Sequence, residues 1–174
     1  MNSMKTKLVM FFLFILLIVG LTSCKTEAIC EGATTSGFSQ FLLDVENLNN
    51  MTLTIYYLSP LALSNHISAE NLMSGTYDNK IVIPGSVLEE FADYLKKLTT
   101  ELLIPIEQEY RLNARLVYVF ETKKDGTVLM IASGVSPSIF VNDEEFAQNN
   151  VFFDAIRPFM TEDALSVLRI FFGQ

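Results

Sequence analysis

The chain has 174 residues, half of them hydrophobic, with 20 acidic side chains against 12 basic ones and a formal net charge of −8. This acidic balance argues against nucleic-acid binding, which relies on Lys and Arg side chains that neutralise phosphates. It also disfavours contact with anionic lipid headgroups, although acidity by itself more often serves solubility than a cationic partner.

The first 24 residues have the three regions of an export signal in the expected order. Lys5 and Lys7 precede an unbroken apolar run at 8–19, and the segment closes with Leu-Thr-Ser-Cys, the cysteine being Cys24. This arrangement resembles the signal peptide and lipobox of bacterial lipoproteins, and the resemblance covers only these residues. It implies that residues 1–23 are removed on export, that Cys24 carries a diacylglyceryl group on its sulfur, and that this lipid anchors the chain on the extracytoplasmic side of a bacterial cell envelope.

Two alternatives compete with a lipid anchor. A transmembrane helix needs about 20 apolar residues to cross a hydrocarbon core of about 30 Å, and the run from Leu8 to Thr22 is shorter than that. Cleavage without lipid attachment favours small residues one and three positions before the cut, where Leu21 fits poorly. The lipoprotein interpretation therefore leads.

Residues 24–39 are predicted to be a lipidated flexible tether, because they are small and polar and have no periodic apolar face. A flexible coil of this length reaches roughly 20 Å. Cys24 and Cys30 are the two cysteines of the chain, so lipidation of the first leaves the second unpaired. A tolerated cysteine is favoured over a reactive thiol or an intermolecular disulfide, since no rigid cationic setting surrounds it.

Residues 40–174 are predicted to form a single domain, long enough to bury a core without disulfides. A short helix or turn is expected at 41–48, where apolar residues recur at helical spacing. The alternation at 51–58 predicts a strand packed on one face. One helical turn at 68–73 and a short strand at 80–83 follow.

The best-marked helix is expected at 86–102. Ser86 is followed three residues later by Glu89, which is the pattern of a capping box. Pro105 ends the helix. The stripe expected to be buried comprises Leu88, Phe91, Leu95, Leu98 and Leu102.

Asp125 and Gly126 form the strongest hairpin signal of the sequence, between strands expected at 113–123 and 127–133. Both strands are apolar on both faces, which places them in the middle of a sheet. A further short strand is expected at 138–141.

Two helices are predicted near the C-terminus. Asn142, with Glu145 three residues later, is expected to cap a helix that continues to Pro158. Thr161 is expected to cap a last helix that runs through Phe172, with acidic residues in its first turn.

This order of elements, with tight links between the later strands, predicts an α+β fold: an antiparallel or mixed sheet of four to five strands with helices packed on it. A doubly wound parallel sheet requires a helix between each pair of strands, and the sequence does not supply them.

The residues that carry chemistry are sparse. His66 is the only histidine of the chain, so a two-histidine metal site is excluded. The stretch 134–138 lacks the closing glycine of a nucleophile elbow. No calcium loop and no glycine-rich phosphate loop occurs. No catalytic residue, metal or cofactor is therefore predicted.

Neighbouring carboxylates are the remaining candidates for acid and base catalysis. Glu107 and Glu109 lie two residues apart, and three acids cluster at 143–145. Glycoside hydrolysis requires a pair held at a fixed separation across a cleft. Acids at a predicted helix start are explained more simply by the helix dipole.

The last helix is apolar around most of its circumference, and phenylalanines are concentrated in the C-terminal third. One interpretation places all of them in the core. The other adds a binding face, in which Phe171 contacts a partner while Phe172, continuing the stripe of Leu165 and Leu168, is buried.

The leading prediction is a non-enzymatic lipoprotein whose domain binds a protein, a peptide or a small ligand outside the membrane. The first alternative is a protective lipoprotein, for immunity or exclusion, that intercepts a cationic toxin or phage component, for which an acidic surface is suited. The second is an envelope enzyme of unrecognised type. The sequence leaves the oligomeric state open.

Overall fold

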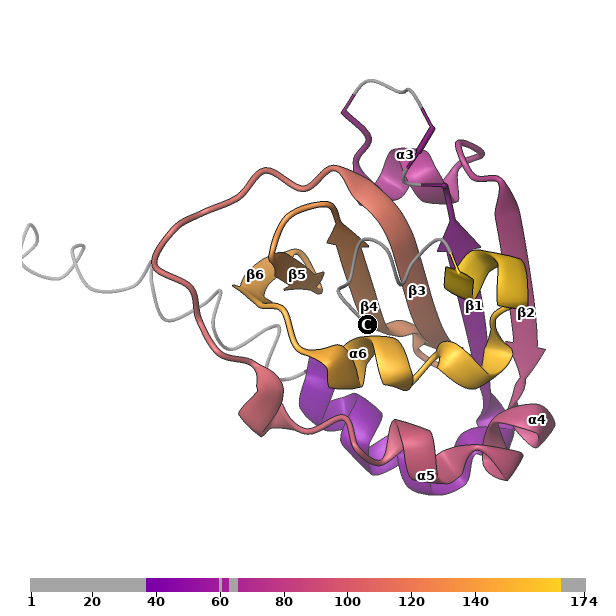
Figure 1. Ribbon diagram of the computed structural model, residues 1–174. Coiled ribbons are helices and arrows are strands. Elements are labelled where there is room, and N and C mark those ends of the chain that lie inside the picture. The colour runs from indigo at the N-terminus through magenta and orange to yellow at the C-terminus, as the bar shows by residue number, and fades with distance from the viewer. Residues whose placement is uncertain (1–36, 60, 63–65, 167–174) are drawn as a thin grey trace, which may run out of the picture. The chain divides into compact units, whose positions relative to one another are not determined.

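The computed structural model describes residues 37–59, 61–62 and 66–166 (Figure 1). The chain divides into two units, 1–33 and 34–174, and every described residue belongs to the second. In the described part of the chain, helices pack against one antiparallel sheet, so the α+β prediction is confirmed.

The sheet has six strands in the order β2-β1-β3-β4-β5-β6, and all neighbouring strands are antiparallel. The strands are β1 (Met51–Tyr57), β2 (Asn79–Pro84), β3 (Ala114–Thr122), β4 (Gly126–Gly134), β5 (Ser138–Val141) and β6 (Glu144–Ala147). The four to five strands predicted are thus exceeded by one, which is β6.

The prediction of a helix capped by Asn142 is wrong. Asn142 and Asp143 have φ angles of 46° and 70° and form the tight turn between β5 and β6. Asn and Asp tolerate this left-handed region better than other non-glycine residues, and they are preferred in two-residue hairpin turns. The Asn142 side-chain oxygen also accepts a hydrogen bond of 2.8 Å from the backbone N–H of Met130, which fixes the turn against β4.

The helix that follows is short. It is α6 (Asn150–Asp154), capped by Asn149, whose side-chain oxygen accepts a hydrogen bond of 3.0 Å from the N–H of Val151. The 3₁₀ helix η3 (Arg157–Phe159) continues the chain. Asn149 thus takes the role that the sequence pattern had given to Asn142.

The helix expected at 86–102 is broken. It consists of α4 (Gly85–Glu90), α5 (Ala92–Leu95) and the 3₁₀ helix η2 (Thr100–Leu102), and α4 begins directly after Pro84 without a side-chain cap. The prediction of a capping box at Ser86 and Glu89 is therefore wrong.

Packing explains this start. A Cβ on Gly85 would overlap the backbone of Leu48 and Asn49, so the first turn of α4 lies directly on the preceding 3₁₀ helix η1 (Val45–Asn50). The contact sets the helix start one residue before Ser86. The buried stripe is nevertheless confirmed at Leu88, Leu95 and Leu98, which are fully buried.

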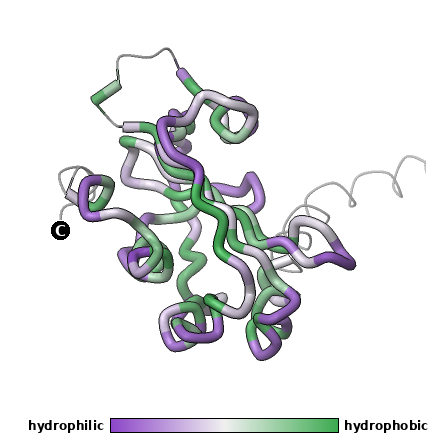
Figure 2. Tube along the Cα trace, turned by 90° about the vertical axis from the view of Figure 1, so that its right-hand side faces the viewer, coloured by the Kyte–Doolittle hydropathy of each residue, from purple (hydrophilic) through white to green (hydrophobic). Residues whose placement is uncertain are grey.

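One face of the sheet, which packs against η1, α4, α5 and α6, carries the main core. Figure 2 shows the central strands as largely hydrophobic, whereas hydrophilic segments are concentrated in the surrounding turns and helices. Residues 37–44 are helical, and Phe38 and Phe41 are fully buried, so the ordered domain begins before the predicted boundary at residue 40. The strand residues of this core include Leu53, Ile55, Tyr118, Phe120 and Ile131, and its helical residues include Phe38, Phe41, Leu88, Leu95 and Phe152.

The opposite face has a smaller core under α3 (Ala69–Met73), where Leu72 packs near Val117 and Ala132. Ser68 caps α3 as the predicted helical turn requires, because its hydroxyl accepts a hydrogen bond of 3.2 Å from Asn71 N–H. Thr54 on this face is buried. The prediction that β1 packs on one face only is therefore wrong, because Thr54 on its second face is buried too.

The β3–β4 hairpin forms as predicted, with Gly126 at a φ of 71° in the position that favours glycine. Thr161 caps the last helical segment, since its hydroxyl accepts a hydrogen bond of 3.3 Å from Ala164 N–H, and residues 162–166 are helical. Within the described ranges, no helix has the length and apolar character needed to cross a membrane.

Candidate functional site

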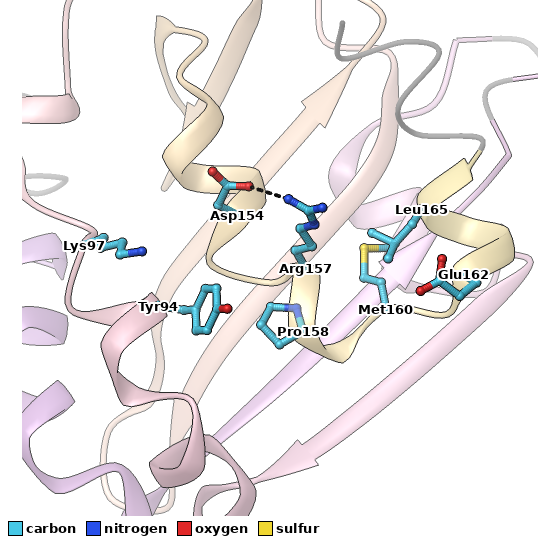
Figure 3. A pocket seen from close by; sticks show the side chains of 8 residues that line it. All are labelled: Tyr94, Lys97, Asp154, Arg157, Pro158, Met160, Glu162 and Leu165. Atoms are coloured by element: carbon cyan, nitrogen blue, oxygen red, sulfur yellow. Dashed lines mark ion pairs between the residues drawn. The ribbon is translucent and has the colours of Figure 1, made fainter. Parts of the chain in front are cut away.

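A cleft of about 630 Å³ lies between α5 and the segment that runs from α6 to residue 165 (Figure 3). Its volume falls in the range of small-ligand sites, about 300–1,000 Å³. We call it the α5–α6 cleft. It is lined by Tyr94, Lys97, Asp154, Arg157, Pro158, Met160, Glu162 and Leu165.

One wall comes from the end of α5. Residues three apart lie on the same side of a helical turn, so Tyr94 and Lys97 face outward together while Leu95 is fully buried behind them. The ring of Phe91 packs edge-on against the ring of Phe159, with centroids 5.1 Å apart. This contact fixes α5 against η3 and sets the width of the cleft.

The other wall comes from η3 and the first turn of the last helical segment. Asp154 and Arg157 form an ion pair of 3.7 Å across one turn. Met160 and Leu165 are buried and provide an apolar floor. Glu162 is exposed in the turn that Thr161 caps.

The two ends of the cleft carry opposite charges. The ammonium nitrogen of Lys97 lies 5.1 Å from the centroid of the Tyr94 ring. Of the three ion pairs formed by the described residues, none includes Lys97 or Glu162. In Figure 3 Lys97 and Glu162 stand on opposite sides of the group, with the ring of Tyr94 and Pro158 between them.

The α5–α6 cleft therefore presents a cation at one end and an anion at the other, separated by an apolar strip and a neutralised Asp154–Arg157 pair. Such a surface orients a polar ligand by its charges and buries the apolar part of that ligand. Because the charges at the centre of the cleft are paired, the orientation of a ligand depends on Lys97 and Glu162 at its ends.

The residues predicted from sequence as functional lie elsewhere. Cys24 and Phe171 are outside the described residues, as is Phe172, so these assignments stay predictions. His66 is exposed in the segment before α3. Leu165 is buried as its stripe predicted, and it also lines the cleft.

Sequence reasoning missed the cleft because Tyr94 and Lys97 are separated from Glu162 by more than sixty positions. Lys97 matched a solvated helix face and Glu162 matched a helix first turn, so each had a sufficient local explanation. The available signal was the spacing of Tyr94 and Lys97, an aromatic residue and a cation three positions apart. Only the fold brings Glu162 to the same cleft.

The acids at 143–145 do not start a helix, so their assignment to a helix dipole is corrected. Glu145 accepts two hydrogen bonds, of 2.9 and 3.0 Å, from the backbone N–H of Tyr110. It thereby holds the long connection before β3 against the sheet edge. Glu107 and Glu109 are exposed. Across the described segments, no group of three or more His, Cys, Asp and Glu side chains is placed to hold a metal ion.

Arg115 is the other unusual polar group, because only 4% of it is exposed. Its Nη1 donates to the side-chain oxygen of Asn113 at 3.1 Å and to the carbonyl of Ala114 at 3.2 Å. Burial lowers the pKa of its guanidinium. Asn113 also accepts a hydrogen bond of 3.1 Å from Ile67 N–H, so this cluster ties a loop to the start of β3 and has a structural role.

Comparison of the chain with protein-family models, with curated proteins and with solved structures found no match.

Proposed function

We propose that this protein is a lipid-anchored, extracytoplasmic binding module that holds a polar ligand in the α5–α6 cleft. The observation that carries the proposal is the pair of unpaired, opposite charges of Lys97 and Glu162 at the two ends of an apolar-floored cleft. Binding sites combine an apolar surface with a few convergent polar groups that fix orientation. The cleft combines Pro158, Met160 and Leu165 with four charged side chains.

The anchor in this proposal is Cys24, on the resemblance of residues 1–24 to a lipoprotein signal. The lipid holds the chain at the membrane, and the tether sets the distance of the domain from it, roughly 20 Å for a flexible coil of this length. A binding domain held in this way samples ligands close to the membrane surface.

The arrangement of the cleft favours binding over catalysis. Nucleophilic catalysis uses a nucleophile and a base within hydrogen-bond reach of each other. In the cleft, Asp154 is held by Arg157, while Lys97 and Glu162 stand apart at opposite ends. Separated charges orient a ligand and do not activate a nucleophile.

The protective alternative draws its support from the net charge of −8. A purely cationic toxin or phage component fits the acidic surface but not the Lys97 end of the cleft. A ligand of mixed charge fits both ends, so we favour it.

The anchor is tested by replacing Cys24 with Ala in the native host. The variant is expected to leave the membrane fraction or to accumulate as an unprocessed precursor, because the sulfur that accepts the lipid is gone. Correct processing and full membrane retention of the variant contradict the anchor.

The binding role is tested by saturation-transfer NMR on the lipidated protein in detergent micelles, with separate pools of amino acids, short peptides and mono- and disaccharides as probes. At least one pool is expected to bind, and the charge-reversed Lys97→Glu variant is expected to lose the members of that pool that the parent protein binds. A matched control is Lys123→Glu, an exposed lysine outside the cleft lining. Absence of binding by every pool contradicts the binding role.

A further inference from the structure

The charges of the α5–α6 cleft narrow the class of its ligand. We propose that the cleft binds an extended peptide segment with an acidic group at one end and a basic group a few residues away. The acidic group pairs with Lys97 and the basic group with Glu162, while the residues between them lie over Pro158, Met160 and Leu165. This inference rests on the proposed function and assigns its ligand.

Lys97 provides the positive end of the cleft. Its ammonium group lies over the ring of Tyr94, 5.1 Å from the ring centroid, and Tyr94 is 40% exposed. A cation over an aromatic face keeps most of its capacity to bind an anion, since the ring occupies only one side of the ammonium group. Lys97 is thereby positioned, but not neutralised, at the mouth of the cleft.

The centre of the cleft holds an ion pair. Asp154 and Arg157 pair with each other, so the middle of the cleft carries no net charge. A peptide group placed there finds a carboxylate oxygen as acceptor and guanidinium N–H groups as donors. A backbone amide offers one donor and one acceptor, which matches this pair, whereas a hydrocarbon chain leaves both groups without a partner.

Glu162 provides the negative end of the cleft. Glu162 is exposed, and the described part of the chain supplies no cation within ion-pair distance of it. The neighbouring floor of Met160 and Leu165 is apolar and buried. A basic side chain with an aliphatic stem matches both features, because the stem packs on the floor while the charge reaches the carboxylate.

Charge complementarity therefore selects a ligand of mixed charge over the other classes. A free anion leaves Glu162 unpaired and a free cation leaves Lys97 unpaired. An apolar ligand leaves the charges at both ends without partners. Peptides combine both charges with a backbone that satisfies the centre.

The test uses fluorine NMR on the full-length lipidated protein in micelles, labelled with fluorotyrosine. The chain has six tyrosines, and the Tyr94 resonance is assigned by its loss in the Tyr94→Phe variant. Tyr118, which is buried, reports whether each variant is folded. Tyr56, on the opposite face of the sheet, is the internal control for a shift outside the cleft.

Four capped pentapeptides are titrated: acetyl-Glu-Ala-Pro-Ala-Lys-amide and the versions with Gln at both ends, Glu at both ends and Lys at both ends. Proline keeps the probes extended and prevents a helical ion pair within the peptide. The mixed-charge peptide is expected to move the Tyr94 resonance and to bind at least about 5-fold more tightly than the other three.

Charge reversal provides the sharpest comparison. Lys97→Glu is expected to transfer the preference to the peptide with two lysines, and Glu162→Lys to the peptide with two glutamates. The double variant again prefers the mixed-charge peptide, which then binds in the reverse direction. Lys123→Glu and Glu107→Lys, at exposed positions outside the cleft lining, make the same changes in net charge and are expected to leave the preference unaltered.

Several results overturn the inference. If saccharides move the Tyr94 resonance and all four peptides fail, the cleft is a binding site for another class. If the mixed-charge peptide binds equally well to both single reversals, the end charges do not select the ligand. Full membrane retention of the Cys24→Ala variant contradicts the anchor alone and leaves the charge preference measured in these titrations unaffected.

Discussion

The sheet core and the α5–α6 cleft treat their polar groups in opposite ways. In the core, the hydroxyl of Tyr118 is fully buried and donates a hydrogen bond of 2.7 Å to the carbonyl of Phe152. In the cleft, Lys97 and Glu162 stand partly in water without an ion-pair partner among the described residues. The buried hydrogen bond of Tyr118 stabilises the fold. The unpaired charges of Lys97 and Glu162 do not hold the fold together.

The difference has an energetic basis. A buried polar group costs free energy unless it is hydrogen-bonded, so its partner is part of the fold. Exposed ion pairs contribute about 0–1 kcal/mol, so the protein neither gains much by pairing cleft charges nor loses much by leaving them free. Stability and binding are therefore expected to respond to different residues.

The largest effect on stability is expected from Phe41→Ala. Phe41 is fully buried, and its ring lies 4.6 Å from that of Phe120 between centroids. Removing a buried aromatic ring costs about 3–5 kcal/mol, which chemical denaturation measures as a lower midpoint. Leu43→Ala is the control, since Leu43 lies on the same helical segment and is 71% exposed, and it is expected to change stability little. Equal losses for both variants contradict the placement of this helix.

A smaller loss is expected from Tyr118→Phe. The variant keeps the ring but leaves the carbonyl of Phe152 without this donor, and an unsatisfied buried acceptor costs about 1–3 kcal/mol. Tyr94→Phe, which removes an exposed hydroxyl, is the matched control and is expected to be nearly neutral. If the unfolding free energy of Tyr118→Phe equals that of the parent protein, the buried hydrogen bond does not hold α6 to the sheet.

Alkaline pH is expected to weaken the same region. Burial raises the pKa of Tyr118 well above its ordinary value, and burial also raises the pKa of Tyr57. An unfolded tyrosine loses its proton near pH 10, about its ordinary pKa, while the folded one keeps it. The stabilising contribution is therefore constant below about pH 10 and falls above it, by up to about 1.4 kcal/mol per pH unit for Tyr118.

Denaturation curves between neutral pH and pH about 11 check this dependence. The Tyr118→Phe variant is expected to show a shallower fall above pH 10 than the parent, because one of the two titrating tyrosines is gone. An unchanged slope in the variant contradicts the assignment of the alkaline transition to Tyr118.

Local patterns in the sequence predicted the elements whose causes are local. The Asp125–Gly126 turn, the helical turn at 68–73 and the Thr161 cap each depend on residues within a few positions. The α+β class followed from the order of those elements. The buried stripe of Leu88, Leu95 and Leu98 was also correct, because burial tracks hydrophobicity even where the helix breaks.

The errors have causes that are distant in sequence. The start of α4 is set by the contact of Gly85 with the backbone of Leu48, and the buried Thr54 lies in a strand that β2 and β3, both later in the chain, flank. Asn142 has the residue type of both a helix cap and a left-handed turn, and pairing with Met130 decides between them. The cleft could not be predicted for the same reason, since its two walls meet only in the folded chain.

The central claim is that the cleft charges serve binding and not stability, and one double variant tests it most directly. Lys97→Gln combined with Glu162→Gln removes both charges and keeps side chains that form hydrogen bonds. The account predicts that the unfolding free energy changes by less than about 0.5 kcal/mol, while the mixed-charge peptide no longer shifts the fluorine resonance of Tyr94. A loss of stability above about 1 kcal/mol together with unchanged peptide binding contradicts the account.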